Sequence, residues 1–144
     1  MNTDKHYQSG ATTPHAQAFG DSVQPVKRAE QAVLVEDGFE VAKGISIEPC
    51  PGHTPGNVVV NVDSMGSKGV MTGDVLHHPL QLMYPNLTTI ADEDSGLAVK
   101  TRNALVERLA DTDTLVMPGH FIAPSVGRIA KRPEGNFEFN FVST

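Results

Sequence analysis

The chain has few of the residues that mark several common protein classes. Of its 144 residues only one, Cys50, is cysteine; none is tryptophan, and 6% are aromatic. A single cysteine cannot form an internal disulfide, which excludes extracellular disulfide scaffolds and cysteine-rich zinc modules. No apolar run approaches the roughly 20 residues of a membrane-spanning helix, and the polar start at 1–10 lacks the apolar stretch of a secretory signal. We therefore expect a cytoplasmic protein with no membrane partner.

Positive charge is also scarce. Lys and Arg number 11 against 17 Asp and Glu, which gives a formal net charge of −6. Without a basic cluster, an acidic chain is a poor binder of a phosphate backbone, so we expect no nucleic-acid partner. The length suits a single domain, since domains typically take roughly 100–200 residues.

The N-terminal sequence predicts a change from irregular to helical structure near residue 21. Residues 1–20 show neither helical nor strand periodicity and contain Gly10, Pro14 and Gly20, so we expect an irregular segment there. Asp21 or Ser22 is a suitable cap for a helix reaching residue 33, with a proline tolerated in its first turn. We place the main domain at 21–144.

The rest of the chain alternates strand-like and helix-like segments. Asp37 and Gly38 predict a hairpin turn between two of the strands. The segment 77–90 reads as a loop, and the helix predicted over 97–110 carries Ala98, Arg102, Leu105 and Leu109 on one face. Together the pattern indicates an α/β layered domain. Strands are expected at 32–35, 39–42, 45–48, 58–62, 68–72, 115–117, 128–131 and 137–141.

Three short segments carry residues suited to metal chemistry. The sequences PGHTPGN at 51–57, TGD at 72–74 and PGH at 118–120 each follow a predicted strand and present His53, Asp74 and His120. Rigid loops at strand ends hold side chains in fixed positions, and imidazole and carboxylate suit zinc or iron. Taken singly, each histidine is also explained as a surface residue and the aspartate as a turn former.

In this order the three motifs resemble the second half of the metallo-β-lactamase superfamily. PGHTPG is the specific one, and both the stretch TGDVLHHPLQ and Thr101-Arg102 on the predicted helix add to the likeness. The resemblance covers about 21–141. It implies an α/β fold that is half of an αββα sandwich: one mixed sheet with flanking helices, the first half being absent.

The resemblance also implies a role for each motif. In the family the histidine of PGHTPG binds one metal, the aspartate of TGD bridges two metals, and the last histidine binds the second. Those positions are His53, Asp74 and His120 here, with two zinc ions as the implied cofactor. The implied reaction is attack of a metal-bound hydroxide, oriented by Asp74, on an ester, lactone or amide-type bond of a small molecule.

The chain departs from the family at its main signature. No His-x-His-x-Asp-His occurs, since His6 and His15 are the only histidines upstream of PGHTPG, and His77-His78 are adjacent. Each metal keeps two ligands where a catalytic zinc usually has three, so we expect weak or partial occupancy. The missing half would come from another chain or a second copy, unless the sequence is a truncated product or a fragment. The alternative is a non-catalytic remnant or interaction module, which pairs an uncovered apolar sheet face with a partner.

Four residues keep two interpretations each. His77 and His78 are either substitute ligands or, more simply, loop residues beside the site. Cys50 is either a thiolate or a small buried hydrophobe. Arg102, on an otherwise apolar helix face, either pairs with a carboxylate near the site or extends to the surface.

Overall fold

The computed structural model describes residues 14–142, and the chain divides into two compact units, 1–36 and 37–144. The first unit contains the helix α2 (Pro14–Ala18), the π-helical turn η1 (Phe19–Val23) and the helix α3 (Gln24–Arg28). Pro25 occupies the first turn of α3, where its missing N–H costs no hydrogen bond.

Three predictions for this unit are wrong. Helical structure begins at Pro14, within the segment expected to be irregular, whose first 13 residues lie outside the described ones. The helix expected to reach residue 33 ends at Arg28, and Glu30 takes a left-handed φ of 56°. The expected strand at 32–35 does not form, and Val33 and Leu34 are more than 80% exposed there. An apolar run alone does not make a strand when no neighbour covers it.

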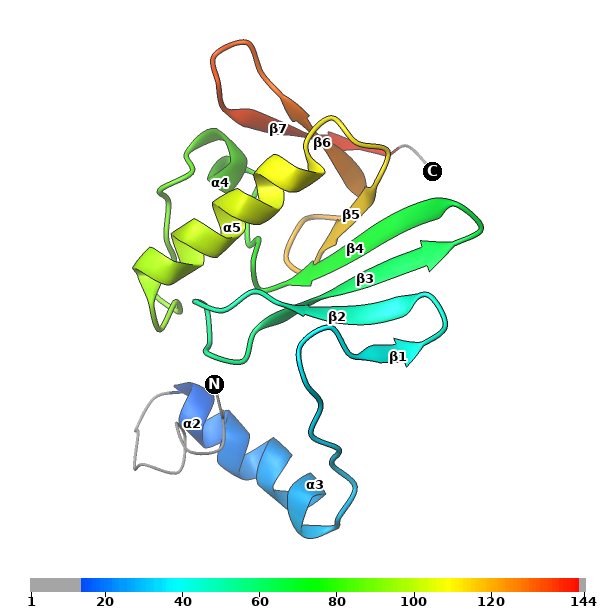
Figure 1. Cartoon of the computed structure of the whole chain (residues 1–144). Helices are drawn as coiled ribbons and strands as arrows, with labels where there is room; N and C mark the ends of the chain where they lie inside the picture. The colour runs from blue at the N-terminus through cyan, green and yellow to red at the C-terminus, as the bar shows by residue number, and fades with distance from the viewer. Residues whose placement is uncertain (1–13, 143–144) are drawn as a thin grey trace. The chain divides into compact units, whose positions relative to one another are not determined.

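The second unit is built on one seven-stranded sheet whose spatial order follows the chain order (Figure 1). Neighbouring strands are antiparallel except β4 and β5, which are parallel. The mixed sheet with flanking helices confirms the predicted fold class. The strands are β1 (Glu40–Ala42), β2 (Ile45–Pro49), β3 (Val58–Ser64), β4 (Ser67–Gly73), β5 (Leu115–Pro118), β6 (Gly127–Lys131) and β7 (Phe137–Phe141).

Tight turns with glycine in the left-handed region join the first strands. Gly44, with φ of 76°, turns β1 into β2, and a side chain there would overlap the Asp63 carbonyl. Met65 and Gly66, with φ of 52° and 83°, turn β3 into β4, as a two-residue hairpin requires. The predicted hairpin at Asp37-Gly38 is wrong, because β1 pairs with the strand that follows it.

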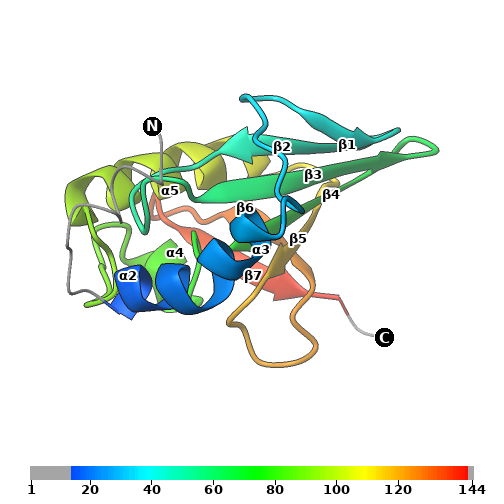
Figure 2. The same ribbon diagram turned by 90° about the horizontal axis from the view of Figure 1, so that it is seen from below.

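The parallel pair needs a crossover, and two helices supply it: α4 (Leu80–Met83) and α5 (Ser95–Leu109). The short helix α4 forms inside the segment expected to be a loop. The Asp94 carboxylate caps α5 by accepting a hydrogen bond from the Leu97 amide at 2.9 Å. The predicted buried face of α5 is confirmed, and it packs on the sheet (Figures 1 and 2) through a core formed by Val59, Val70, Leu105, Leu109, Val116 and Ile129, among others.

The opposite face of the sheet is also apolar. Side chains alternate between the two faces of a strand, so Val58 and Met71 lie on the face opposite Val59 and Val70. Ile45, Val58 and Met71 remain 36%, 36% and 48% exposed. The sheet therefore carries one packed face and one partly open apolar face. Among residues 14–142, every helix is too short or too polar to span a bilayer.

Candidate metal centre

Three connections at the ends of strands bring the predicted site residues together. The turn after β2 carries His53, the end of β4 carries Asp74, and the end of β5 carries His120. The turn at His53 lies against the start of α5: Gly52, with φ of 135°, is so close that a Cβ would lie 2.2 Å from the Ala98 nitrogen. Glycine is thus required there, and the Thr101 hydroxyl donates to the Pro51 carbonyl at 2.8 Å.

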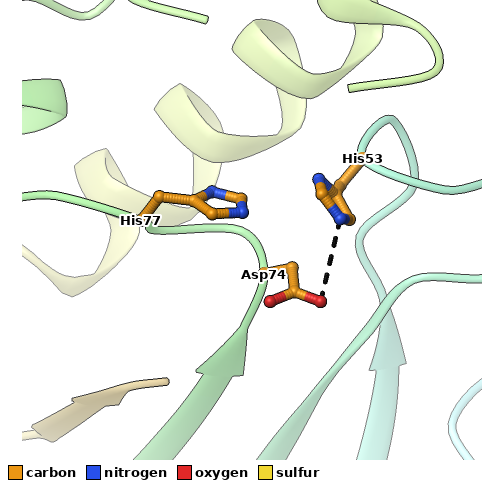
Figure 3. Close-up of side chains that lie close together, drawn as sticks. All are labelled: His53, Asp74 and His77. Atoms are coloured by element: carbon orange, nitrogen blue, oxygen red, sulfur yellow. Dashed lines mark ion pairs between the residues drawn. The ribbon is translucent and has the colours of Figure 1, made fainter. Parts of the chain in front are cut away.

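His53 is buried and oriented by a second carboxylate. Its Nδ1 lies 3.1 Å from Asp92 Oδ1, and the two side chains are 7% and 2% exposed. Asp92 is held in turn, because its Oδ2 accepts a hydrogen bond from the Thr89 amide at 3.1 Å. A carboxylate at Nδ1 places the proton of a neutral imidazole on that atom, so Nε2 carries the lone pair that can bind a metal. Nε2 lies 3.8 Å from Asp74 Oδ2 (Figure 3).

Asp74 stands between two histidines, with one oxygen toward each. Oδ2 is the oxygen nearest His53, whereas Oδ1 lies 2.6 Å from His120 Nε2. Unlike His53, this second pair is open to solvent, with Asp74 and His120 side chains 45% and 51% exposed. The Asp74 carboxylate can therefore interact with two groups at once, one through each oxygen.

His77 also belongs to this cluster, although its simpler interpretation was a loop residue beside the site. Its ring lies 4.9 Å from the His53 ring and stacks on His120 at 4.7 Å with an interplanar angle of 13°. Ligand atoms of His53, Asp74 and His77 all lie within 4.8 Å of one another, and Figure 3 shows these side chains facing a common point. Burial and the imidazoles of His53 and His120 lower the pKa of His77. The signal in the sequence is a histidine three residues after the aspartate of TGD.

The other residues with open interpretations take structural positions. His78 Nδ1 accepts a hydrogen bond from the Leu80 amide at 3.1 Å, as a loop residue would. Cys50 is buried in the core, as its simpler interpretation predicted, and burial raises the pKa of its thiol. Arg102 is 1% exposed, so its surface interpretation is wrong; it donates to the carbonyls of Pro85 and Leu87 at 3.2 and 2.6 Å.

The distances fit one zinc position better than two. Zinc bonds of about 2.0–2.2 Å put two ligand atoms at most about 4.4 Å apart. The 3.8 Å between His53 and Asp74 meets that limit, and the His77 ring needs to close by a few tenths of an ångström at most. Asp74 Oδ1 and His120 Nε2, at 2.6 Å, are in direct hydrogen-bonding contact.

Comparison with known proteins identifies a family and similar structures. The family model "Metallo-beta-lactamase superfamily" matches residues 3–120. The chain is similar in structure to AidC, described as a dizinc quorum-quenching lactonase, at 23% identity and a TM-score of 0.77, covering 91% of this chain and 43% of AidC. It is likewise similar to the hydrolase AbOPH, at 20% identity and a TM-score of 0.76, covering 90% of this chain and 44% of that one.

A third similar structure is a probable metal-dependent hydrolase from Staphylococcus aureus, at 17% identity and a TM-score of 0.61, covering 81% of this chain and 42% of that one. At identities this low, the structural similarity shows a shared fold and no more. The chain spans less than half the length of each of these structures. Comparison with curated protein sequences finds no significant match.

Proposed function

Because the chain belongs to the metallo-beta-lactamase superfamily, we propose that its site hydrolyses an ester, lactone or amide-type bond of a small molecule with the help of bound zinc. His53, Asp74 and His120 form the proposed metal site, in which His120 contacts Asp74. The observation that carries the proposal is the placement of Asp74, whose two carboxylate oxygens face one histidine each. A lactone is the first substrate class to test, since the similar structure AidC is described as a lactonase.

Each residue has a separate task in this proposal. His53 offers Nε2 because Asp92 holds Nδ1, and Asp74 offers Oδ2 from the opposite side. Zinc, when bound, would supply Lewis-acid polarisation of the substrate carbonyl and lower the pKa of the attacking water. Asp74 Oδ1, on the side of the exposed His120, would orient that water and accept its proton. His120, at 2.6 Å from the same oxygen, stabilises the carboxylate.

The test is hydrolysis of a chromogenic lactone by the zinc-loaded chain. We expect zinc-dependent turnover that falls at least about 100-fold in kcat/KM in Asp74→Asn, since the variant loses both a ligand and a proton acceptor. Asp63→Asn, an exposed carboxylate on β3, is the matched control and should keep its activity. A folded, zinc-loaded chain without turnover on lactone or ester probes would contradict the proposal.

The open apolar sheet face favours a second candidate function, an interaction module. Ile45, Val58 and Met71 lie partly exposed on one face of the sheet, and exposed apolar patches promote association. In this alternative the chain is not catalytic, and a partner chain or a second copy covers the face. Sedimentation of the wild type against Met71→Asp separates the two: a complex lost in the variant supports the module. For either function we propose a cytoplasmic location, because a single buried thiol is compatible with a reducing compartment.

A further inference from the structure

The metal site of this chain is short of protein ligands when only the three motif residues are counted. His53 and Asp74 give two ligands at one position, whereas a catalytic zinc takes three and keeps a fourth position open. We propose that His77 is the third ligand, that it closes a His53–Asp74–His77 site for a single divalent cation, and that His120 stays outside that ion's coordination. The inference rests on the metal-dependent function proposed above and assigns its site.

The positions of the three side chains support this assignment. Their ligand atoms lie within 4.8 Å of one another, and they converge from three directions in Figure 3. The His77 ring is tilted by 46° to that of His53, so the two rings do not stack and one nitrogen of each can face the same ion. Two imidazoles and one carboxylate are a donor set that zinc binds in known enzymes.

The loop that carries His77 is anchored independently of any ligand. Leu76, the preceding residue, is fully buried in the core. The side chain of Gln81, itself 3% exposed, accepts hydrogen bonds from the amides of His77 and His78 at 2.8 and 3.3 Å. The backbone of His77 is therefore fixed beside the site, and only its ring has to turn to close it.

His77 also has an unmet requirement that a cation would satisfy. Its Nδ1 is buried, and among the described residues no hydrogen-bond partner reaches it. An unpaired buried polar atom costs about 1–3 kcal/mol. Coordination of a cation through Nδ1 would offset that cost.

His120 is better suited to position the ligands than to bind the same ion. Its Nε2 shares a hydrogen bond with Asp74 Oδ1 at 2.6 Å, so that nitrogen is engaged, and its ring stacks on His77. It thus contacts two of the three proposed ligands. A second ion at Asp74 and His120 would have to break this hydrogen bond, which is why we expect one ion per chain.

Calorimetric titration with zinc and absorption spectroscopy with cobalt test the inference on the full chain. We expect one ion per wild-type chain, and a loss of affinity in His77→Ala beyond the ~10–100-fold that outer-shell partners cost. His77→Cys should restore binding and add a sulfur-to-cobalt charge-transfer band, which a merely structural residue would not produce. His78→Ala is the adjacent control and should bind like the wild type, and His120→Ala should still bind one ion. Thermal unfolding of each variant checks that it folds.

Two results would overturn the inference: unchanged affinity in a folded His77→Ala, or two ions of which one is lost in His120→Ala. Zinc-dependent hydrolysis by His77→Ala at the wild-type rate would refute the inference and leave the proposed function intact. An ion bound through His77 without hydrolysis would refute the function and leave the inference intact. A folded wild-type chain that binds no ion would contradict both.

Discussion

The two histidines that flank Asp74 are held by very different amounts of structure. His53 is 7% exposed, its Nδ1 faces a buried aspartate, and its loop is held by hydrogen bonds to the start of α5. His120 is 51% exposed and follows β5 directly, with Asp74 as its hydrogen-bond partner. The His53 side of the centre is therefore already organised to bind a metal, whereas the His120 side is open to solvent.

The difference lies in what packs behind each residue. Behind His53 stand Asp92, which fixes its ring, and Arg102, which holds the 85–87 backbone nearby. Because His53 is preorganised, its side chain does not have to be ordered when a metal binds. The entropic cost of ordering side chains therefore falls on the His120 side of the site. The comparison teaches that metal affinity should depend mainly on the His53 side.

The largest expected effect is an inequality between the two histidines. His53→Ala should weaken zinc binding by more than about 100-fold, because it removes a preorganised ligand. His120→Ala should weaken it by less than about tenfold, because the exposed ring only steadies Asp74. Competition against a chromophoric chelator measures both, and equal losses would break the comparison.

Removing the buried guanidinium should destabilise the His53 side as a whole. Arg102→Met keeps the apolar stem but removes the guanidinium donor from the Pro85 carbonyl and leaves the Leu87 carbonyl only its longer bond from Gln81 at 3.4 Å, at a cost of about 2–3 kcal/mol. Urea unfolding measures this loss. Arg128→Met, at an exposed arginine, is the control and should change stability by less than about 0.5 kcal/mol; similar losses in both would show that Arg102 is not a support.

Asp92→Asn should lower zinc affinity by ~10–100-fold, since the carboxylate that orients the His53 ring loses its charge. Asp94→Asn lies on the same segment and preserves the cap of α5, because asparagine caps as well as aspartate. The same chelator competition should therefore give Asp94→Asn a wild-type affinity. An unaffected Asp92→Asn would show that His53 needs no orienting partner.

The smallest expected effect concerns Cys50, which precedes the His53 loop. Burial raises the pKa of its thiol, so the folded chain keeps the proton to a higher pH than the unfolded chain. The protonated thiol's contribution to the free energy of unfolding is therefore complete below the unfolded thiol's pKa, and it is lost as the pH rises through the raised pKa of the folded thiol. A thiol reagent should react at least ~10-fold more slowly with the native chain than in urea. Fast native labelling would show that this loop opens readily.

The sequence predicts most of the larger unit because its signals are local. The strands from Ile45 onward alternate or run apolar between turn residues, and the predicted helix over 97–110 has a mostly apolar face, so these elements appear close to where periodicity places them. The errors concentrate before residue 40. There the apolar run at 32–35 has no neighbouring strand, and a single sequence does not reveal whether a neighbour exists.

The site is predictable in part for the same reason. His53, Asp74 and His120 each follow a strand within a recognisable motif, and the structure brings them together. Asp92 lies in no such motif, and His77 is marked only by its place three residues after Asp74. The proximity of both to the site arises from the path of the chain between β4 and α5. The burial of Arg102 is likewise a tertiary effect, since its partners are carbonyls 15 and 17 residues away.

The metal content of the purified chain tests the central claim most directly. After loading with zinc and dialysis against metal-free buffer, elemental analysis should find one zinc ion per chain in the wild type and in His120→Ala, and none in His53→Ala. No zinc in a folded wild-type chain, or zinc retained in His53→Ala, would contradict a metal centre organised around His53.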